Sequence, residues 1–323
     1  MNNQQPATLA VAKEGRDAQY FRASEAGLWH FSFVDFWQAR PLLLKMGEME
    51  SAQFTDLKPY PQERGKQILN REKYLKTAEQ AIDMLRSGAL AKVVLSRKEF
   101  IPAHVSSIDL FHALRDAYPQ ATVYCFQHPD AGTWLGASPE VLLDKKGEQL
   151  STMSLAGTKA ADAETEFGSK EKEEQQLVTD YIVNTLNSQT ELSQVETGER
   201  QEILAGPVKH LRTAILASCE KNWRPEQLLA ALHPTPAVCG LPLKEAKAFI
   251  AQVEAHDREY YCGYFGLRAQ DDFFYRVNLR CARLFADGVE LFAGGGLTAD
   301  SEPLAEWQET EVKMQTIRNM LKL

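Results

Sequence analysis

The chain has 323 residues, of which 44% are hydrophobic and 25% charged, and its formal net charge is −8 at pH 7. These values are typical of a globular protein with one large domain or two small ones. The negative charge, without any cluster of Lys and Arg, argues against a nucleic-acid partner.

At the N-terminus, no charged segment precedes an apolar core, so no signal peptide is expected. No apolar run is long enough to span a bilayer, and no membrane partner is expected. Five cysteines are dispersed without C-x-x-C spacing, which indicates reduced thiols and argues against a disulfide framework or a zinc site. Together these features predict a cytoplasmic protein.

The first half of the chain alternates between helix and strand signals after a stretch with few of either. Residues 1–65 offer mainly an aromatic-rich patch, LWHFSFVDFW, which we interpret as an edge hairpin. Apolar residues at helical spacing predict a helix over 70–86 and a short capped helix over 106–118. Apolar and β-branched runs between turn residues predict four strands: KVVLSRKEFI, ATVYCFQH, GTWLGASPEVLL and QLSTMSLAGT.

Helix signals dominate the next part of the chain. Helical periodicity predicts three helices, over 168–190, 225–233 and 244–256. The segment KHLRTAILA fits either a strand or a helix.

The last third is predicted to be an antiparallel meander that leads into a helix. Its three strands are YYCGYFGLRA, FFYRVNLRCARLF and VELFAGGGLT. The pair Asp287-Gly288 is a hairpin signal. Asp300-Ser301 offers an N-cap for the final helix, and Pro303 suits its first turn. Strand groups followed by helices, without strict βαβ alternation, predict an α+β layered fold.

Two acidic pairs, Glu171 with Glu174 and Glu306 with Glu309, open two of the predicted helices. Residues three apart are neighbours on one helix face, and each pair here continues into an apolar stripe. Carboxylates that point toward the interior are costly unless they are paired, and a Mg²⁺ ion between the helix starts would remove that cost. The alternative is that these glutamates only favour the positive end of a helix dipole.

Lys92 and Glu140 are candidates for proton transfer. Lys92 begins a strand among apolar neighbours, where a desolvated amine can act as a base; the alternative is a solvated surface lysine. Glu140 follows a proline in an apolar run, where burial would raise its pKa and suit a general acid. The alternative for Glu140 is the polar side of a half-buried strand.

Glycine and cationic side chains complete the candidate site. The segment LAGT and the triple glycine that starts at Gly294 end strands, where backbone N–H groups could approach an anion, although either could be a bulge. The triple glycine does not have the spacing of a nucleotide-binding loop. Arg280 could bind a carboxylate or form a cross-strand ion pair, and His233 could be a local structural hydrogen-bonder. The set suits a small, multiply anionic substrate bridged by Mg²⁺.

At these residues the chain resembles the chorismate-utilising enzymes, which include anthranilate, aminodeoxychorismate, isochorismate and salicylate synthases. The resemblance runs from KVVLSR to the C-terminus, and its motifs stand in the family order: KVVLSR, GASPEVLL, LAGT, KEKEEQQLV, HPTPAVCGLP, NLRCARL, LFAGGGL and EWQETEVK. Within the family, HPTPAVCGLP and KVVLSR are most similar to the isochorismate synthase branch.

The resemblance implies an isomerase that converts chorismate reversibly to isochorismate with Mg²⁺ as cofactor, on the way to menaquinone, a siderophore or salicylate. It implies that Lys92 is the base that activates water and Glu140 the acid that protonates the departing hydroxyl. The metal positions it implies are Glu174 and Glu309, accompanied by Glu171 and Glu306. The substrate positions it implies are Gly157, His233, Arg280, Gly294 and Lys313.

The resemblance also implies one large α+β domain, with layered, mainly antiparallel sheets flanked by helices around a central cleft. Residues 66–323 would form the chorismate-binding part, residues 1–65 would belong to the same domain, and the protein would act as a monomer. Gln175 departs from the family pattern, which has histidine there. The alternatives are a salicylate synthase, which adds pyruvate elimination, and a family member that only binds ligand.

Overall fold

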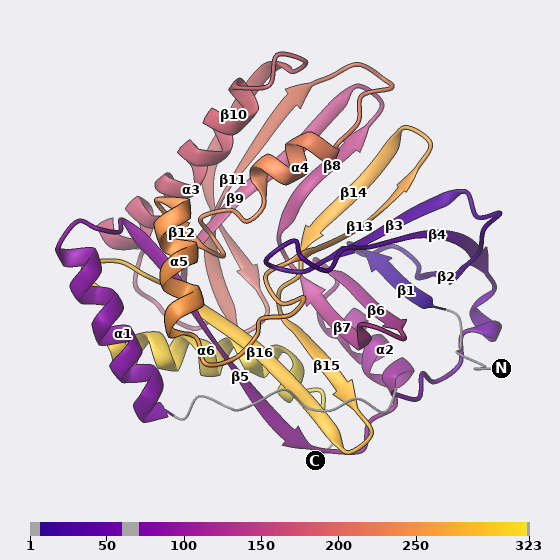
Figure 1. Ribbon diagram of the computed structural model, residues 1–323, viewed down its shortest axis with the longest axis horizontal. Coiled ribbons are helices and arrows are strands. Elements are labelled where there is room, and N and C mark those ends of the chain that lie inside the picture. Colours follow the sequence, from indigo (N-terminus) through magenta and orange to yellow (C-terminus); the bar gives the residue numbers. More distant parts are fainter. Residues whose placement is uncertain (1–6, 60–70, 322–323) are drawn as a thin grey trace.

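The computed structural model describes residues 7–59 and 71–321. In these residues sixteen strands form one sheet, and every pairing in it is antiparallel (Figure 1). The strand order is β10-β11-β9-β8-β14-β13-β3-β4-β2-β1-β6-β7-β15-β16-β5-β12. None of the described helices has the length and apolar character needed to cross a membrane.

The strands follow one another along the chain in sixteen segments. Their bounds are β1 Thr8–Lys13, β2 Gln19–Ala23, β3 Trp29–Val34, β4 Leu42–Met49, β5 Lys92–Pro102, β6 Thr122–His128, β7 Gly132–Ser138, β8 Val141–Lys146, β9 Gln149–Ala160, β10 Ser193–Ala205, β11 Val208–Ser218, β12 Gly240–Leu241, β13 Tyr264–Ala269, β14 Asp272–Val277, β15 Cys281–Phe285 and β16 Gly288–Leu297.

Six α-helices and a short 3₁₀-helix lie between these strands in the described residues. They are α1 Arg71–Arg86, α2 Ser107–Ala117, α3 Ser169–Asn187, α4 Glu226–Leu232, α5 Leu243–Val253, α6 Pro303–Arg318 and η1 Ser51–Gln53. Helix α3 packs on β9 and β11, α6 packs on β16, and α2 covers β6 and β7 (Figure 1). The predicted α+β architecture is confirmed.

The long sheet folds over on itself, so that aromatic side chains from distant strands meet in one core. Phe33 of β3 lies 5.1 Å from Phe126 of β6 between ring centroids, and Tyr124 of β6 lies 4.3 Å from Phe265 of β13. These strands are not neighbours in the sheet order. Contact between their rings therefore defines two layers, as the prediction of layered antiparallel sheets requires.

The predictions for the N-terminal part need one correction. LWHFSFVDFW forms β3, but β3 pairs with both β4 and β13 and is therefore an interior strand, not part of an edge hairpin. Phe31 and Phe33 are buried because the face of β3 that they share lies in the core and both edges of the strand are paired, whereas His30 on the opposite face is exposed. Strands β1 to β4 join the common sheet, whereas residues 1–6 and 60–65 lie outside the described residues. The division at residue 65 stays a prediction.

The predicted meander is wrong, because the run FFYRVNLRCARLF is two strands. Strand β14 pairs with β13 and β8, whereas β15 pairs with β7 and β16, so the chain changes layers between them. Buried Asn278 holds this crossing by accepting a hydrogen bond from Tyr124 Oη at 2.7 Å and donating one to the Tyr260 carbonyl at 2.9 Å. Arg280 follows with a positive φ of 47°. The predicted hairpin at Asp287-Gly288 joins β15 to β16 and is confirmed.

A second predicted strand, GTWLGASPEVLL, is likewise divided. Strand β7 ends at Ser138 and β8 begins at Val141, because Pro139 has no N–H to continue the ladder. The Ser138 hydroxyl donates to the Val277 carbonyl at 2.6 Å, and the Val277 amide donates to the Glu140 carbonyl at 3.2 Å. The two breaks are therefore joined to each other, with Glu140 at one and Arg280 at the other.

The remaining predictions differ in detail. The helix predicted over 70–86 is α1, with residue 70 outside the described part of the chain, and KHLRTAILA is strand β11. Strand β10 was not predicted, because it is an edge strand with mostly exposed polar residues. The N-cap of α6 is Glu302, since the Ser301 hydroxyl donates to Glu306 instead of accepting from the helix.

Candidate active site

A cavity of about 60 Å³ lies where the two strand breaks, the end of β9, β11, β16 and α6 meet. Seven of the residues predicted from the sequence line it: Glu140, Gly157, Glu174, Arg280, Gly294, Glu309 and Lys313. They come from positions between 140 and 313 of the chain, so the fold has brought them together. The central cleft expected for this fold is therefore present at the predicted residues.

Lys92 lies directly behind the cavity wall. Its side chain is wholly buried, and its ammonium forms an ion pair of 3.0 Å with Glu174 Oε1. Gly296 of strand β16 lies beside this ion pair. A Cβ at this position would collide with Glu174 and lie 3.0 Å from Lys92 Cε. Glycine at this position therefore makes room for the Lys92–Glu174 pair.

The acidic pairs are only partly brought together. Glu171 caps its own helix, where its carboxylate accepts a hydrogen bond of 2.8 Å from the Gly168 amide, and it does not line the cavity. Glu306 is buried next to Gly295 and accepts from the Ser301 hydroxyl at 2.6 Å. Its second oxygen is buried without a hydrogen-bond partner among the described residues.

Lysine side chains compensate the carboxylates that face this region. Glu306 pairs with Lys170 at 3.1 Å, and Glu309 pairs with Lys313 at 2.5 Å. Lys313 also donates to the Gly294 carbonyl at 2.8 Å. With the Lys92–Glu174 pair, each carboxylate near the cavity from α3 and α6 has one ammonium beside it.

Burial sets the protonation of two acidic groups. It raises the pKa of Glu140 to about 8, although Lys92 and Lys313 act in the opposite direction. It also raises the pKa of Glu306 to about 7, with a further contribution from the negative charge of Glu309. At neutral pH Glu140 is therefore mostly a neutral carboxylic acid that can donate a proton.

The donor set near α3 and α6 is chemically suited to a hard divalent cation. It consists of carboxylate oxygens, the ligands that Mg²⁺ prefers, and one oxygen of Glu306 lacks a partner. Repulsion between Glu306 and Glu309 is the kind of cost that a bound cation removes. Across residues 7–59 and 71–321, however, no three His, Cys, Asp or Glu side chains are grouped as metal ligands.

His233 does not line the cavity. It is buried between α4 and β13, where its ring meets Tyr264 edge-on at 5.1 Å between centroids. Burial lowers the pKa of His233 to about 3, so the ring is neutral. The loop that follows it does reach the cavity, through Ala237 and Val238.

His210 is a lining residue that sequence reasoning missed. Its Nε2 lies 3.0 Å from Arg280 Nη2, and because a guanidinium can only donate, this nitrogen accepts. The proton is therefore on Nδ1, which donates to the Gly157 carbonyl at 3.0 Å. Burial and the charge of Arg280 hold the pKa of His210 well below its usual value. Only the pairing of β11 with β9, which places His210 opposite Thr158, could have revealed it.

Tyr261 and Cys262 also line the cavity and were missed. They lie in the turn before β13, and Cys262 has a positive φ of 60°. Burial raises the pKa of the Cys262 thiol to about 12, so it is a neutral wall residue. No local sequence signal marks these positions.

Gln175, where the family pattern has histidine, points away from the cavity. Its amide nitrogen donates to Ser154 Oγ at 2.7 Å and Thr213 Oγ1 at 3.0 Å, and its oxygen accepts from Arg200 at 2.7 Å. Gln175 therefore fixes α3 on β9 and β11, next to Glu174, without contacting the predicted metal region.

The comparisons with known proteins agree with this fold and site. A family model described as chorismate binding enzyme matches residues 35–322. Isochorismate synthase EntC of Escherichia coli (strain K12) is 35% identical over 247 residues, which is 72% of this chain and 62% of that protein. The salicylate biosynthesis isochorismate synthase of Pseudomonas aeruginosa is 34% identical and covers 75% of this chain and 53% of its own length. The match thus spans less than two thirds of either relative.

Among solved structures, the putative 2,3-dihydroxybenzoate-specific isochorismate synthase DhbC of Bacillus anthracis has a TM-score of 0.83 at 23% identity. The superposition covers 99% of this chain and 97% of that one. The chain belongs to the chorismate-binding enzyme family, and its fold is that of the isochorismate synthases.

Proposed function

We propose that this protein is an isochorismate synthase, an isomerase that converts chorismate reversibly to isochorismate. The observation that carries the proposal is that Glu140, with a pKa of about 8, lines a cavity together with Arg280 and Lys313, while the amine-bearing side chain of Lys92 lies directly behind the wall of that cavity at Gly296. A proton donor, a candidate base and two cations are what the isomerisation of a dianionic substrate requires.

In this proposal the cationic groups hold the substrate. Arg280 has no carboxylate partner among the described residues and donates only to Thr316 and His210. Burial lowers its pKa to about 10, and a bound carboxylate would offset that cost. Lys313 also lines the cavity and can bind a second anionic group of the substrate.

The chemical step then needs two proton transfers. Lys92, as the free amine, takes a proton from water while the water oxygen bonds to one ring carbon. The hydroxyl on another ring carbon leaves with the proton that Glu140 donates, and the double bonds shift between the two carbons. Water enters and water departs, so the net reaction is an isomerisation, and proton exchange resets Lys92 and Glu140.

We propose Mg²⁺ as the cofactor, held by Glu174, Glu306 and Glu309. When bound, it supplies positive charge to these carboxylates and an open coordination position for a substrate oxygen. Glu174 also forms the ion pair with Lys92, so this carboxylate links the proposed metal position to the proposed base. Glu171 caps α3 and remains only an accompanying acidic position in this proposal.

Product analysis tests the proposed reaction. The protein is incubated with chorismate and Mg²⁺, and the products are separated by chromatography. Isochorismate, in equilibrium with chorismate, is the expected product. Salicylate and pyruvate in comparable amounts would instead identify a salicylate synthase, and unchanged chorismate would indicate a family member that only binds ligand.

Binding of Mg²⁺ and chorismate is expected to be mutually reinforcing, because the substrate completes a coordination shell that the protein leaves open. Each ligand should raise the affinity of the other by the same factor. Calorimetric titration of Mg²⁺ with and without a non-reacting chorismate analogue measures this factor. Equal Mg²⁺ affinities in the two titrations would show that the carboxylates and the substrate do not share a cation.

A further inference from the structure

A second and much larger cavity, of about 880 Å³, adjoins the catalytic one. Pro139 and Arg280 line both cavities, so the two share a wall at the strand breaks. The large cavity reaches the protein surface, since Leu204 on its rim is 65% exposed. It is therefore an open chamber that leads from solvent to Arg280.

The floor of this chamber continues into the catalytic cavity along two paired strands. Side chains alternate between the faces of a strand, so residues two apart share a face. On β9, Met153 lines the chamber and Leu155 lines the catalytic cavity; on β11, Arg212 lines the chamber and His210 the catalytic cavity. Arg212 pairs with Leu155 in the ladder. The same face of the sheet thus connects both spaces.

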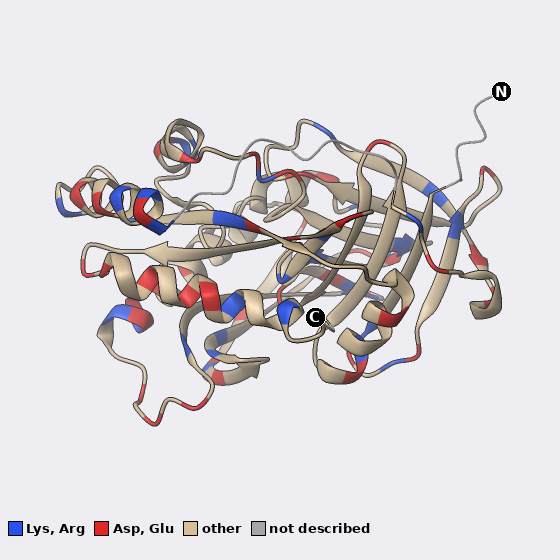
Figure 2. Ribbon diagram, turned by 90° about the horizontal axis from the view of Figure 1, so that it is seen from below, with Lys and Arg blue, Asp and Glu red and all other residues tan. Residues whose placement is uncertain are grey.

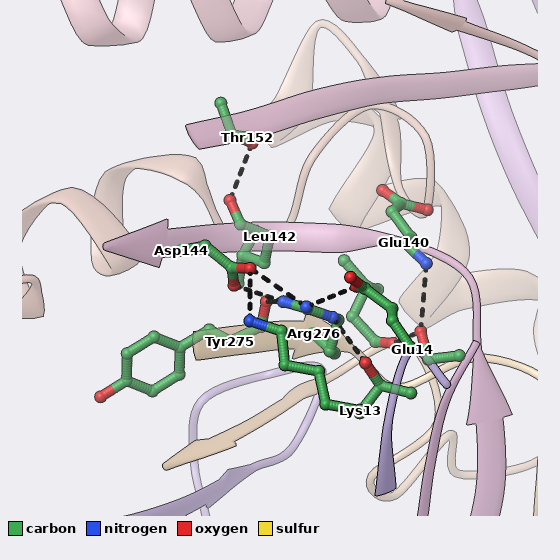
Figure 3. A network of polar contacts seen from close by, with 11 residues as sticks. Lys13, Glu14, Glu140, Leu142, Asp144, Thr152, Tyr275 and Arg276 are labelled. Carbon is green, nitrogen blue, oxygen red and sulfur yellow. Dashed lines mark hydrogen bonds and ion pairs between the residues drawn. The ribbon is translucent and has the colours of Figure 1, made fainter. Parts of the chain in front are cut away.

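The acidic groups of the chamber are already neutralised. Asp144 pairs with Lys13 at 2.9 Å and with Arg276, and Arg276 also pairs with Glu14 at 2.9 Å (Figure 3). These four side chains form one ion-pair network beside the chamber, and their charges cancel. Charged residues of both signs are interspersed over the rest of the molecule (Figure 2).

Two arginines in the chamber keep uncompensated positive charge. Arg212 donates to Gln201 Oε1 at 3.1 Å, and its Nε is buried without a hydrogen-bond partner among the described residues. Arg280 donates to Thr316 and His210, both neutral. No carboxylate in the described part of the chain lies within ion-pair distance of either guanidinium. Because they line one chamber, they generate a positive potential from its mouth to the catalytic cavity.

We propose that this chamber is the route by which the dianionic substrate reaches the catalytic cavity, and that Arg212 is the first cation it meets. The proposal rests on the proposed function for the identity of the substrate. Arg212 attracts the anion and Arg280, which faces both cavities, receives it. His210 lies two residues from Arg212 on β11, and its ring accepts a hydrogen bond from Arg280. The ring is neutral, so it does not repel the anion.

The association rate of chorismate tests this route. Stopped-flow mixing can follow quenching of tryptophan fluorescence, because Trp134 stacks on Phe292 of the catalytic cavity at 5.2 Å between centroids. Arg212→Gln is expected to lower the association rate constant about 3- to 10-fold at low ionic strength, and the difference should shrink as salt screens the charge. Arg224→Gln is the matched control, since half-exposed Arg224 lines neither cavity.

A second variant tests the route by size. Met153→Phe places a bulkier, rigid ring on the chamber floor without adding a tryptophan, and it is expected to slow association at every salt concentration, because the obstruction is steric. Association rates equal to those of the unchanged protein in both Arg212→Gln and Met153→Phe would overturn the proposal. Fluorescence reports binding without turnover, so a protein that binds chorismate by this route but does not isomerise it would refute only the proposed function.

Discussion

Replacing Glu140 with Gln is expected to lower kcat about 10²–10⁴-fold with a smaller effect on chorismate binding, because the general acid acts in the chemical step. The amide has nearly the same size and can still form hydrogen bonds, but it cannot protonate the departing hydroxyl. Initial rates at saturating chorismate measure kcat, and the same titration separates kcat from KM.

The pH dependence of the unchanged protein carries the same information. Glu140 has a pKa of about 8 and is mostly protonated below that pH. Activity that depends on this acid should therefore fall as the pH rises through about 8. In Glu140→Gln this decrease should be absent. The folded state also holds this proton between about pH 4.5 and 8 while the unfolded state does not, so the contribution of Glu140 to stability falls as pH rises across that range.

Glu290→Gln provides the matched control for Glu140. Glu290 is 2% exposed and pairs with Lys98 at 3.0 Å, outside the catalytic cavity. Its replacement should destabilise the fold but leave kcat within about twofold. A Glu140→Gln protein that lost chorismate affinity and kept its turnover rate would contradict the assignment of Glu140 as the acid.

Lys92→Ala is expected to abolish most of the turnover, by a factor of about 10²–10⁴, because the substitution removes the amine that lies behind Gly296 and is proposed to activate water. The substitution also leaves the Glu174 carboxylate without its ion-pair partner. A loss of stability should therefore accompany the loss of activity, on the order of 3–5 kcal/mol for a buried pair.

Lys98→Ala separates these two effects. It breaks a buried Lys–Glu pair of the same length, 3.0 Å, in the neighbouring part of strand β5. Unfolding in urea should show comparable destabilisation of both variants, whereas kcat at a temperature where both are folded should fall only in Lys92→Ala. Unchanged turnover in Lys92→Ala would rule out its role as the base.

The sequence by itself determined the chemical groups of the site. Lys92 at a strand start, Glu140 after a proline and the glycine run at Gly294 are local features, and their residue types dictate the chemistry that they can perform. Helices α3 and α6 could also be predicted, because the apolar spacing of α3 and the N-terminal signals of α6, such as Pro303, are properties of consecutive positions. The order of the motifs was enough to indicate the family.

The tertiary structure alone decided which of these groups meet. Strand pairing across the layers broke two apolar runs, at Pro139 and at Asn278, and so placed Glu140 and Arg280 at one cavity. Pairing of β11 with β9 places His210 in the cavity lining. Glu171 instead caps the N-terminus of α3, and His233 is buried in the core. Local periodicity states how a segment folds but not which distant segment it pairs with, since that choice depends on packing of the whole sheet.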